Sequence, residues 1–567
     1  MAAPPTQAVL HQDIGHDHDH EKNDQSKQAH VTVSENAQPQ GDLSKTDFRD
    51  AEHELLEKQE PTLKSLVKNK RAVAICACII MNAVLQSNDG GIGSSLLGMP
   101  SFCKMMGEGY QKDGQYAVPP KTVTAWSGVA AAPQVLGLFY ASYIADYFGR
   151  RFNMYLLFAM IVIGTAVELA ASNWKVWCIS KFILSASAGI MESGCALYLS
   201  EIAPRELRGV AITMYGMCQQ FGQLLCTLIA YGCQQRWPDA DEKLSFRVPL
   251  IICLILPFIV VVFELFYLVE SPYWLLMRDR PEDARKSVRF IYPNATEHEI
   301  NVRLAEYTYI LRKEADSKKL QEHAMFRDCF KGVDARRTFV AIIPTLSSQL
   351  AGNILVGPYA TYFLQQAGQT NSLRDTCIAV GVGLFAYLCV LTFIDHPRVG
   401  RWKLLFTGII FMNIAMLGIG VTGTVWTSPY PSTAAPAFIT WVTLGVIGNS
   451  VGPGACGFIY AAEAGSARLR ALSNSLGQTI RGVLSMTYGL AIAYMLDGGA
   501  LGVRGAGYWF LGWGLIALVL TYFFIPDFTG RSYANIDELF ERRIPARKWS
   551  RIECTGGYGR DFVVTPE

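Results

Sequence analysis

The chain carries little charge for its length. Of its 567 residues only 17% are Asp, Glu, Lys or Arg, whereas soluble globular proteins contain about 25%. Basic residues exceed acidic ones by only 50 − 48 = 2, and no long basic run occurs, which argues against nucleic acid as a partner. Half of the residues are hydrophobic and the mean hydropathy is +0.20. This composition excludes an ordinary chain of soluble domains.

Motifs that define several enzyme and metal-protein classes are also missing. The 14 cysteines are scattered through apolar stretches without CxxC spacing, so we interpret them as small buried residues and predict no metal site. No GxxxxGK[ST] loop occurs, which argues against ATP as an energy source. The nine histidines lie outside the apolar stretches, with His396 just beyond the end of one. We therefore expect neither enzymatic activity nor a cofactor.

Long apolar runs are what the sequence does contain. In residues 248–269, Glu264 is the only charged residue over roughly the thickness of a bilayer, and Pro249 and Pro257 are the only prolines. The chain is therefore predicted to be an all-α integral multi-pass membrane protein in contact with the lipid bilayer. The twelve predicted spans are 72–97, 123–145, 152–173, 176–199, 210–233, 247–269, 338–364, 375–395, 402–423, 435–460, 471–496 and 506–526.

These spans form two groups of six with a charged, partly helical segment between them. The sequence HDHDH at 16–20 allows a metal-binding tail, but we favour a solvated polar tail. The predicted division is a disordered cytosolic N-terminal tail (1–60), a first six-helix half (61–269), a cytosolic helical segment (270–337), a second six-helix half (338–526) and a cytosolic C-terminal tail (527–567).

Basic residues are concentrated in alternate connections between the spans. One set of connections contains Arg150, Arg151, Arg401, Lys403 and the charged central segment, while the other set is poorer in Lys and Arg. The positive-inside rule then places the central segment and both termini in the cytosol. The first residues lack a basic region followed by an apolar core, so we expect no cleavable signal peptide. We expect the protein in the plasma membrane, with the vacuolar membrane as the alternative.

Two short motifs recur in the two halves. IADYFGRRF (144–152) returns in altered form as IDHPRVGRWK (394–403), and EIAPRELR (201–208) returns as EAGSARLR (463–470). The offsets are 400 − 149 = 251 and 463 − 201 = 262 residues. Duplicated six-helix halves are typical of transporters that rock about a central site.

An ordered series of motifs then resembles the sugar porter family of the major facilitator superfamily over about residues 70–550. Within that family, 327–338, 349–368 and 531–549 most resemble fungal α-glucoside (maltose-type) permeases. The resemblance implies a monomeric carrier that works by alternating access. The motifs are NDGG (88–91), D…GRR (146–151), LYLSEIAPRELRG (197–209), VESPYWLL (269–276), GP (452–453) and IPDFTGR (525–531).

Paired acidic and basic residues at the cytosolic helix ends form the candidate gate. A carboxylate and a guanidinium can form a bidentate pair that joins helices and breaks on rotation, although the arginines could instead only anchor the spans in the cytosol. The family resemblance implies the first role. In the second half Pro397 stands where the family has an acid, and Asp395 lies two residues upstream of that position. We therefore expect the ion pairs at the cytosolic helix ends to be weaker in the second half. The gate residues are Asp146, Arg150, Arg151, Glu201, Arg208, Arg401, Glu463 and Arg470.

Asp89 in the first span is the candidate proton-coupling residue. A charge at the centre of a spanning helix costs roughly 2.5–3.5 kcal/mol, so it needs a partner or a function. Lys181 in the fourth span is the expected partner, at a position where the family has arginine, and the resemblance implies that Asp89 alternates between Lys181 and a proton. The alternative is that Asp89 only caps a broken helix among its neighbouring glycines.

Amides and aromatic rings suit a sugar site because hydroxyls need donors and acceptors while the C–H faces pack on rings. Gly216, Ser348, Ile354 and Cys456 replace contacts that the family usually has, so the substrate can differ from a hexose. Glu192 and Arg481 either pair with each other across the halves or recognise a polar ligand. The predicted substrate-binding residues are Gln349, Gln223, Glu192, Tyr359, Tyr362, Asn353 and Arg481.

We therefore predict a proton-coupled symporter of a sugar, most specifically an α-glucoside. Glu192 and Arg481 favour a second hypothesis, a carrier or exporter of another polyol-like or weakly charged metabolite. A third hypothesis is a sugar sensor without transport. Sensors of this lineage typically have a long cytosolic tail, and only about forty residues follow the last span here.

Overall fold

The computed structural model describes most of the chain from residue 68 to residue 552. The described residues are 68–112, 115–204, 207–321, 326–369, 371–394, 399–426, 430–465, 469–496, 501–529 and 533–552. The polar tail with its HDHDH sequence lies outside them, as does Asp395.

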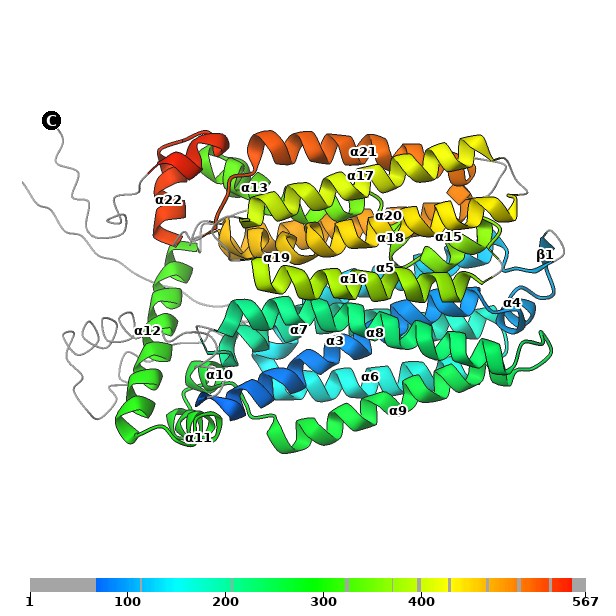
Figure 1. Ribbon diagram of the computed structural model, residues 1–567. Helices are drawn as coiled ribbons and strands as arrows, with labels where there is room; N and C mark the ends of the chain where they lie inside the picture. Colours follow the sequence, from blue (N-terminus) through cyan, green and yellow to red (C-terminus); the bar gives the residue numbers. More distant parts are fainter. Residues whose placement is uncertain are drawn as a thin grey trace, which may run out of the picture. The chain divides into compact units, whose positions relative to one another are not determined.

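The first half is built from six long helices. In a bilayer every backbone N–H and C=O must find a partner within the protein, which for apolar segments of this length favours helices. In Figure 1 these helices run lengthwise through the bundle. They are α3 (Lys70–Leu97), α5 (Pro120–Phe148), α6 (Arg150–Ala170), α7 (Trp174–Ile202), α8 (Arg208–Arg236) and α9 (Leu244–Tyr267).

The second half repeats this arrangement with two interrupted spans. The predicted span 338–364 is broken at Gly352, whose φ of 85° is left-handed, and the span 435–460 is broken at Gly452 and Pro453. Each of these two spans is therefore built from more than one helical segment, because these residues end one segment and begin another. The helices are α13 (Gly332–Leu350), α14 (Asn353–Val356), α15 (Ala360–Gln366), α16 (Ser372–Phe393), α17 (Arg401–Val425), α18 (Ala435–Val451), α19 (Pro453–Glu463), α20 (Arg470–Leu496) and α21 (Gly502–Phe524).

Ten segments of the described chain are long and apolar enough to cross a membrane. The more polar α8 and the broken segment α13–α15 complete the twelve predicted spans. Large apolar side chains point outward from the spans, among them Phe266 and Phe385, which are 75% and 67% exposed. These features confirm the predicted class, an all-α protein of two six-helix halves that spans the membrane.

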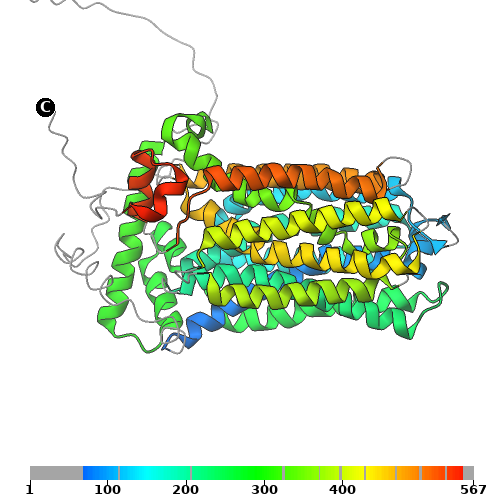
Figure 2. The same ribbon diagram turned by 45° about the horizontal axis from the view of Figure 1, so that its top comes forward.

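The two ends of the helix bundle carry different short elements (Figures 1 and 2). We call the first end, where α12 crosses the ends of the long helices, the α12 end, and the opposite one the α4 end. The helices predicted in the central segment are confirmed as α11 and α12. The α12 end carries α10 (Pro272–Met277), α11 (Pro281–Ile291), α12 (Glu297–Gln321) and α22 (Tyr533–Glu541), and the α4 end carries α4 (Pro100–Met106) and an antiparallel hairpin of β1 (Gln111–Lys112) and β2 (Gln115–Tyr116).

The described part of the C-terminal tail packs against the second half. Asp537 of α22 forms an ion pair with Arg337 at the start of α13. Trp549, in the 3₁₀ helix Ala546–Arg551, is fully buried against Phe540 and Phe528. The tail therefore belongs to the folded second half at the α12 end.

The apolar core shows how the halves meet. At the α4 end one cluster contains residues of both halves, including Leu96 and Phe102 of the first and Phe363 and Tyr488 of the second. At the α12 end each half has a core of its own. The halves are therefore packed together at the α4 end.

Candidate functional site

A buried arginine connects α6 to the end of α7 at the α12 end. Arg150 donates from Nε to both carboxylate oxygens of Glu201, at 3.1 and 3.0 Å, and from Nη2 to Oε1 at 2.7 Å. Its Nη1 also lies 2.9 Å from Oδ1 of Asp146. Such a multiply bonded pair is both strong and directional. It joins helices of the same half.

The second half contains the corresponding pair. Nη1 of Arg401, at the start of α17, lies 2.6 Å from Oε2 of Glu463, at the end of α19. The pair stands at the same place in the internal repeat as Arg150 and Glu201. The two halves thus each join their third and fourth spans through an arginine and a glutamate.

Two acids that the sequence analysis did not select complete these arrangements. Glu270 accepts a hydrogen bond of 2.7 Å from the backbone N–H of Arg150, where it faces the N-terminus of α6. In the second half, Thr529 Oγ1 accepts from the backbone N–H of Arg401 at 2.7 Å and donates to Asp527 at 2.6 Å. The offset 527 − 270 = 257 matches the repeat, so the repeat could have identified both acids.

The remaining predicted gate residues are Arg151, Arg208 and Arg470. Arg151 forms no ion pair among the described residues, and its Nε instead donates to the hydroxyl of Tyr155 at 2.9 Å. The described contacts therefore do not show the ion pair that we predicted for Arg151. The side chains of Arg208 and Arg470 lie outside the description.

Lys181 lies in a buried ion pair within the first half. Its Nζ is 2.9 Å from Oε1 of Glu168 on α6, and both side chains are at most 10% exposed. The ammonium also lies 5.1 Å from the ring centre of Trp177, a favourable cation–π arrangement. The sequence analysis missed Glu168 because the pairing joins two helices. The side chain of Asp89 is outside the description.

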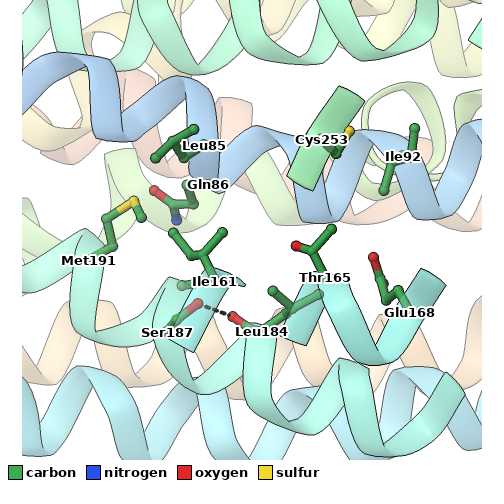
Figure 3. A pocket seen from close by; sticks show the side chains of 11 residues that line it. Leu85, Gln86, Ile92, Ile161, Thr165, Glu168, Leu184, Ser187, Met191 and Cys253 are labelled. Atoms are coloured by element: carbon green, nitrogen blue, oxygen red, sulfur yellow. Dashed lines mark hydrogen bonds between the residues drawn. The ribbon is translucent and has the colours of Figure 1, made fainter. Parts of the chain in front are cut away.

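A cavity lies beside this ion pair, enclosed by helices of the first half. Its volume of about 20 Å³ leaves room for about one water molecule. Figure 3 shows Glu168 and Thr165 toward one end and Gln86 toward the other. Ser187 adds a further polar group to a mainly apolar lining.

Glu192 and Arg481 form an ion pair between the two halves. The glutamate is on α7 and the arginine on α20, and their side chains are 14% and 19% exposed. Arg481 Nε also donates to Gln478 at 2.9 Å, and the guanidinium lies 5.7 Å from the ring centre of Phe458. Of the two alternatives, the pairing of these residues is therefore present in this structure.

The interrupted segment α13–α15 makes further polar contacts with the first half. The Tyr359 hydroxyl lies 2.6 Å from the hydroxyl of Ser127 on α5. Gln223 of α8 donates to the backbone carbonyl of Gly357 at 3.4 Å. Residues of the interrupted segment α13–α15 thus join the two halves on the side of the α4 end.

Gln349 has an unsatisfied amide at the end of α13. It is 7% exposed, and its Oε1 accepts no hydrogen bond from the described chain. Its neighbour Ser348 instead donates to Asn449 at 2.8 Å. Asn353 is half-buried at the start of α14, whereas Tyr362 packs in the core shared by the halves. Buried polar atoms are normally paired, so the oxygen of Gln349 is a hydrogen-bond acceptor that the described chain leaves unsatisfied.

These observations define the class of the protein. Two repeated six-helix halves, polar contacts between them and interrupted spans are the architecture of a membrane transporter. Within that class the chain belongs to the sugar (and other) transporter family, which it matches over residues 75–540.

Several proteins of known function are similar to this chain. The general alpha-glucoside permease of Saccharomyces cerevisiae is 26% identical over 509 residues, which are 88% of this chain and 80% of the permease. The maltose permease MAL31 of the same yeast is 24% identical over 502 residues, covering 87% of this chain and 79% of the permease.

The fold is also that of a solved transporter. The xylose transporter XylE of E. coli, in a partially occluded inward-open conformation, aligns with a TM-score of 0.63 at 18% identity, covering 82% of this chain and 100% of XylE. The proton:xylose symporter XylE bound to 6-bromo-6-deoxy-D-glucose aligns with a TM-score of 0.65 at 17% identity, covering 83% and 100%.

Proposed function

We propose that the protein is a proton-coupled symporter of an α-glucoside, with the sugar bound between the two halves. The observation that carries the proposal is the buried amide oxygen of Gln349 at the break of α13, which has no hydrogen-bond partner among the described residues. A sugar hydroxyl is a donor that can satisfy such an oxygen. The similarity to alpha-glucoside and maltose permeases favours this substrate class.

Proton coupling is supported by the buried cation of Lys181. An ammonium inside a spanning helix needs a carboxylate as its partner. When that carboxylate takes up a proton it becomes neutral and no longer holds the ammonium. Asp89 and Glu168 are the two acids that we propose for this exchange. The proton:xylose symporter XylE has the same fold.

We propose that the α12 end faces the cytosol and that the protein works as a monomer in the plasma membrane. The paired arginines Arg150 and Arg401 and the charged helices α11 and α12 are at this end, which the positive-inside rule favours. The packed α4 end then faces outward. Transport would alternate by parting the halves at one end while they close at the other.

The cross-half pair supports a second candidate function. Glu192 and Arg481 place a carboxylate and a guanidinium between the halves, where they could bind a weakly charged metabolite after exchanging partners. Such a carrier would prefer a charged polyol derivative to a neutral α-glucoside.

Uptake by transporter-null cells that express the full chain tests both candidates. Labelled maltose, glucose and inositol are supplied with and without a proton uncoupler. We expect maltose uptake that the uncoupler abolishes. Uptake of none of the three favours the metabolite carrier, and uptake that survives the uncoupler contradicts symport.

Gln349→Ala tests the binding site itself. The loss of one ligand hydrogen bond of about 1 kcal/mol predicts a KM for maltose about fivefold higher. Asn413→Ala is the matched control, because Asn413 is also a buried amide with an unpartnered oxygen but lies between α17 and α21 of one half. An equal rise of KM in both variants would contradict a ligand contact at Gln349.

Asp89→Asn tests proton coupling. Because asparagine cannot take up a proton at neutral pH, we expect sugar exchange to continue while accumulation against a gradient stops. The measurement compares counterflow of labelled maltose with net uptake in the same cells. Persisting uphill uptake would refute the role of Asp89.

A further inference from the structure

A tyrosine of the second half reaches a position where the first half has no side chain. Helix α8 of the first half packs against α16 of the second half (Figure 1). A Cβ at Gly216 of α8 would lie 2.6 Å from the hydroxyl oxygen of Tyr387 of α16 and 3.5 Å from Cζ of its ring. Because 2.6 Å is too short for a contact between carbon and oxygen, the hydroxyl of Tyr387 occupies the space that a side chain at position 216 would need.

The packing of Tyr387 fixes its hydroxyl in this place. The hydroxyl donates to the backbone carbonyl of Gly454, near the start of α19, at 3.0 Å. Tyr387 is 5% exposed and belongs to the apolar core of the second half, together with Cys456. A ring in a packed core does not move aside without cost. The oxygen accepts no hydrogen bond from the described residues, so it keeps a free acceptor position.

Polar contacts connect Tyr387 with the position of Gln349. Ser348, the neighbour of Gln349, donates to Oδ1 of Asn449 at 2.8 Å. Nδ2 of Asn449 lies 3.2 Å from the position of a Cβ at Gly454, and the carbonyl of Gly454 accepts from Tyr387. These contacts join the end of α13 to the junction of α18 with α19, the two breaks of the second half. Tyr387 and Gln349 therefore belong to one group of polar contacts.

The contact between Gly216 and Tyr387 lies on the α12 side of Gln223. Helix α7 ends at Ile202 at the α12 end, and α8 begins there at Arg208. Gly216 precedes Gln223 by seven residues on α8, which is about 10 Å along the helix axis. The hydroxyl of Tyr387 therefore lies between the level of Gln223 and the α12 end of the bundle.

We propose that Tyr387 is a further sugar-binding residue that determines specificity, with its oxygen accepting a hydrogen bond from one hydroxyl of the α-glucoside. A sugar hydroxyl is a donor that matches the free acceptor position, and the side chains that face the sugar come from both halves. Gly216 contributes by leaving the space that the hydroxyl of Tyr387 occupies. A sugar that lacks the contacted hydroxyl leaves the acceptor unsatisfied and is bound less well. The inference rests on the proposed transport of an α-glucoside.

Tyr387→Phe tests the contact in transporter-null cells that express the full chain. Phenylalanine keeps the ring and removes the oxygen, so we expect the KM for labelled maltose to rise about fivefold. Tyr460→Phe is the matched control, because the buried hydroxyl of Tyr460 also donates to a backbone carbonyl at 3.0 Å, that of Pro526, outside the proposed sugar site. An unchanged KM in Tyr387→Phe, or an equal rise in both variants, would overturn the contact.

Monodeoxy maltoses distinguish a sugar contact from a structural effect. Each analogue lacks one hydroxyl, and its inhibition constant against labelled maltose is measured in the wild type and in Tyr387→Phe. We expect one analogue to bind the wild type about fivefold more weakly than maltose but to bind Tyr387→Phe as well as maltose does. If every analogue had the same affinity relative to maltose in both proteins, Tyr387 would have only a structural role and the proposal would be wrong.

Gly216→Ala provides an independent test of the same contact. In the wild type the added methyl group displaces the hydroxyl of Tyr387, so we expect a similar rise of the KM for maltose, about fivefold. In Tyr387→Phe the nearest atom to this methyl group is Cζ at an ordinary 3.5 Å, so the same substitution should cause no further rise. Equal rises in the two backgrounds would contradict the contact. A wild type that takes up no maltose would instead refute the proposed function, and the sugar contact with it.

Discussion

Single glycines determine how the third helix of each half begins. Gly149 and Gly400 precede α6 and α17 with φ of 102° and 74°, a backbone conformation that other residues rarely adopt. A Cβ at these positions would lie 2.6 Å from Glu270 Oε2 and 2.9 Å from Asp527 Oδ2. The missing side chain therefore lets an acid approach the start of each helix.

Gly149→Ala is expected to lower the free energy of unfolding by about 2 kcal/mol, because the strained backbone and the displaced Glu270 both cost stability. The thermal midpoint of the purified full chain in detergent measures the change. Gly232→Ala is the control, since a Cβ at Gly232 of α8 meets nothing within 4 Å. Equal midpoints for the two variants would contradict this interpretation.

At the scale of elements, α5 and α7 approach each other through paired glycines. A Cβ at Gly189 would lie 2.1 Å from the backbone oxygen of Gln134, and one at Gly137 would lie 2.4 Å from that of Ala186. Spanning helices associate largely by such close packing, because lipid offers no hydrophobic driving force between them. The contact thus fixes the distance between the second and fourth spans.

Gly189→Ala is expected to destabilise the fold by about 3 kcal/mol, because the backbone of α5 has to move away. Size-exclusion chromatography and thermal melting of the purified chain report the loss. Gly381→Ala serves for comparison, since its Cβ would meet Leu224 at an ordinary 3.9 Å. A Gly189 variant as stable as the Gly381 variant would show that the helices can separate at little cost.

At the scale of the whole molecule, the two halves share a core at the α4 end and have separate cores at the α12 end. Ser127 of α5 and Gly489 of α20 lie on opposite sides of this contact. The Cβ of Ser127 is 3.7 Å from the position of a Cβ at Gly489. This separation matches that of a disulfide.

Cysteines at positions 127 and 489 are therefore expected to form a disulfide on oxidation and to hold the halves together at the α4 end. Alternating access requires that contact to open, so uptake should stop in the oxidised double variant and return on reduction. Mass spectrometry identifies the bond, and each single variant provides a control. Transport by the fully cross-linked protein would exclude opening at this contact.

Particular residues show how far the sequence analysis reached. The repeat placed Arg150, Glu201, Arg401 and Glu463 at corresponding helix ends, and the structure joins them in pairs. The break at Gly352 was missed, because glycine also occurs within continuous spanning helices. Glu168 was missed as well, because nothing in its neighbouring residues indicates that Lys181 of another helix lies beside it.

The sequence by itself determined the membrane class, the twelve spans and their division into two repeated halves, because apolar length and repeated motifs are local properties of the chain. Only the tertiary structure decided which charges meet. Glu192 pairs with Arg481 across 289 residues, and Glu264 meets Asn82 across 182. Helix packing sets such contacts, and packing depends on the shapes of side chains from several helices at once.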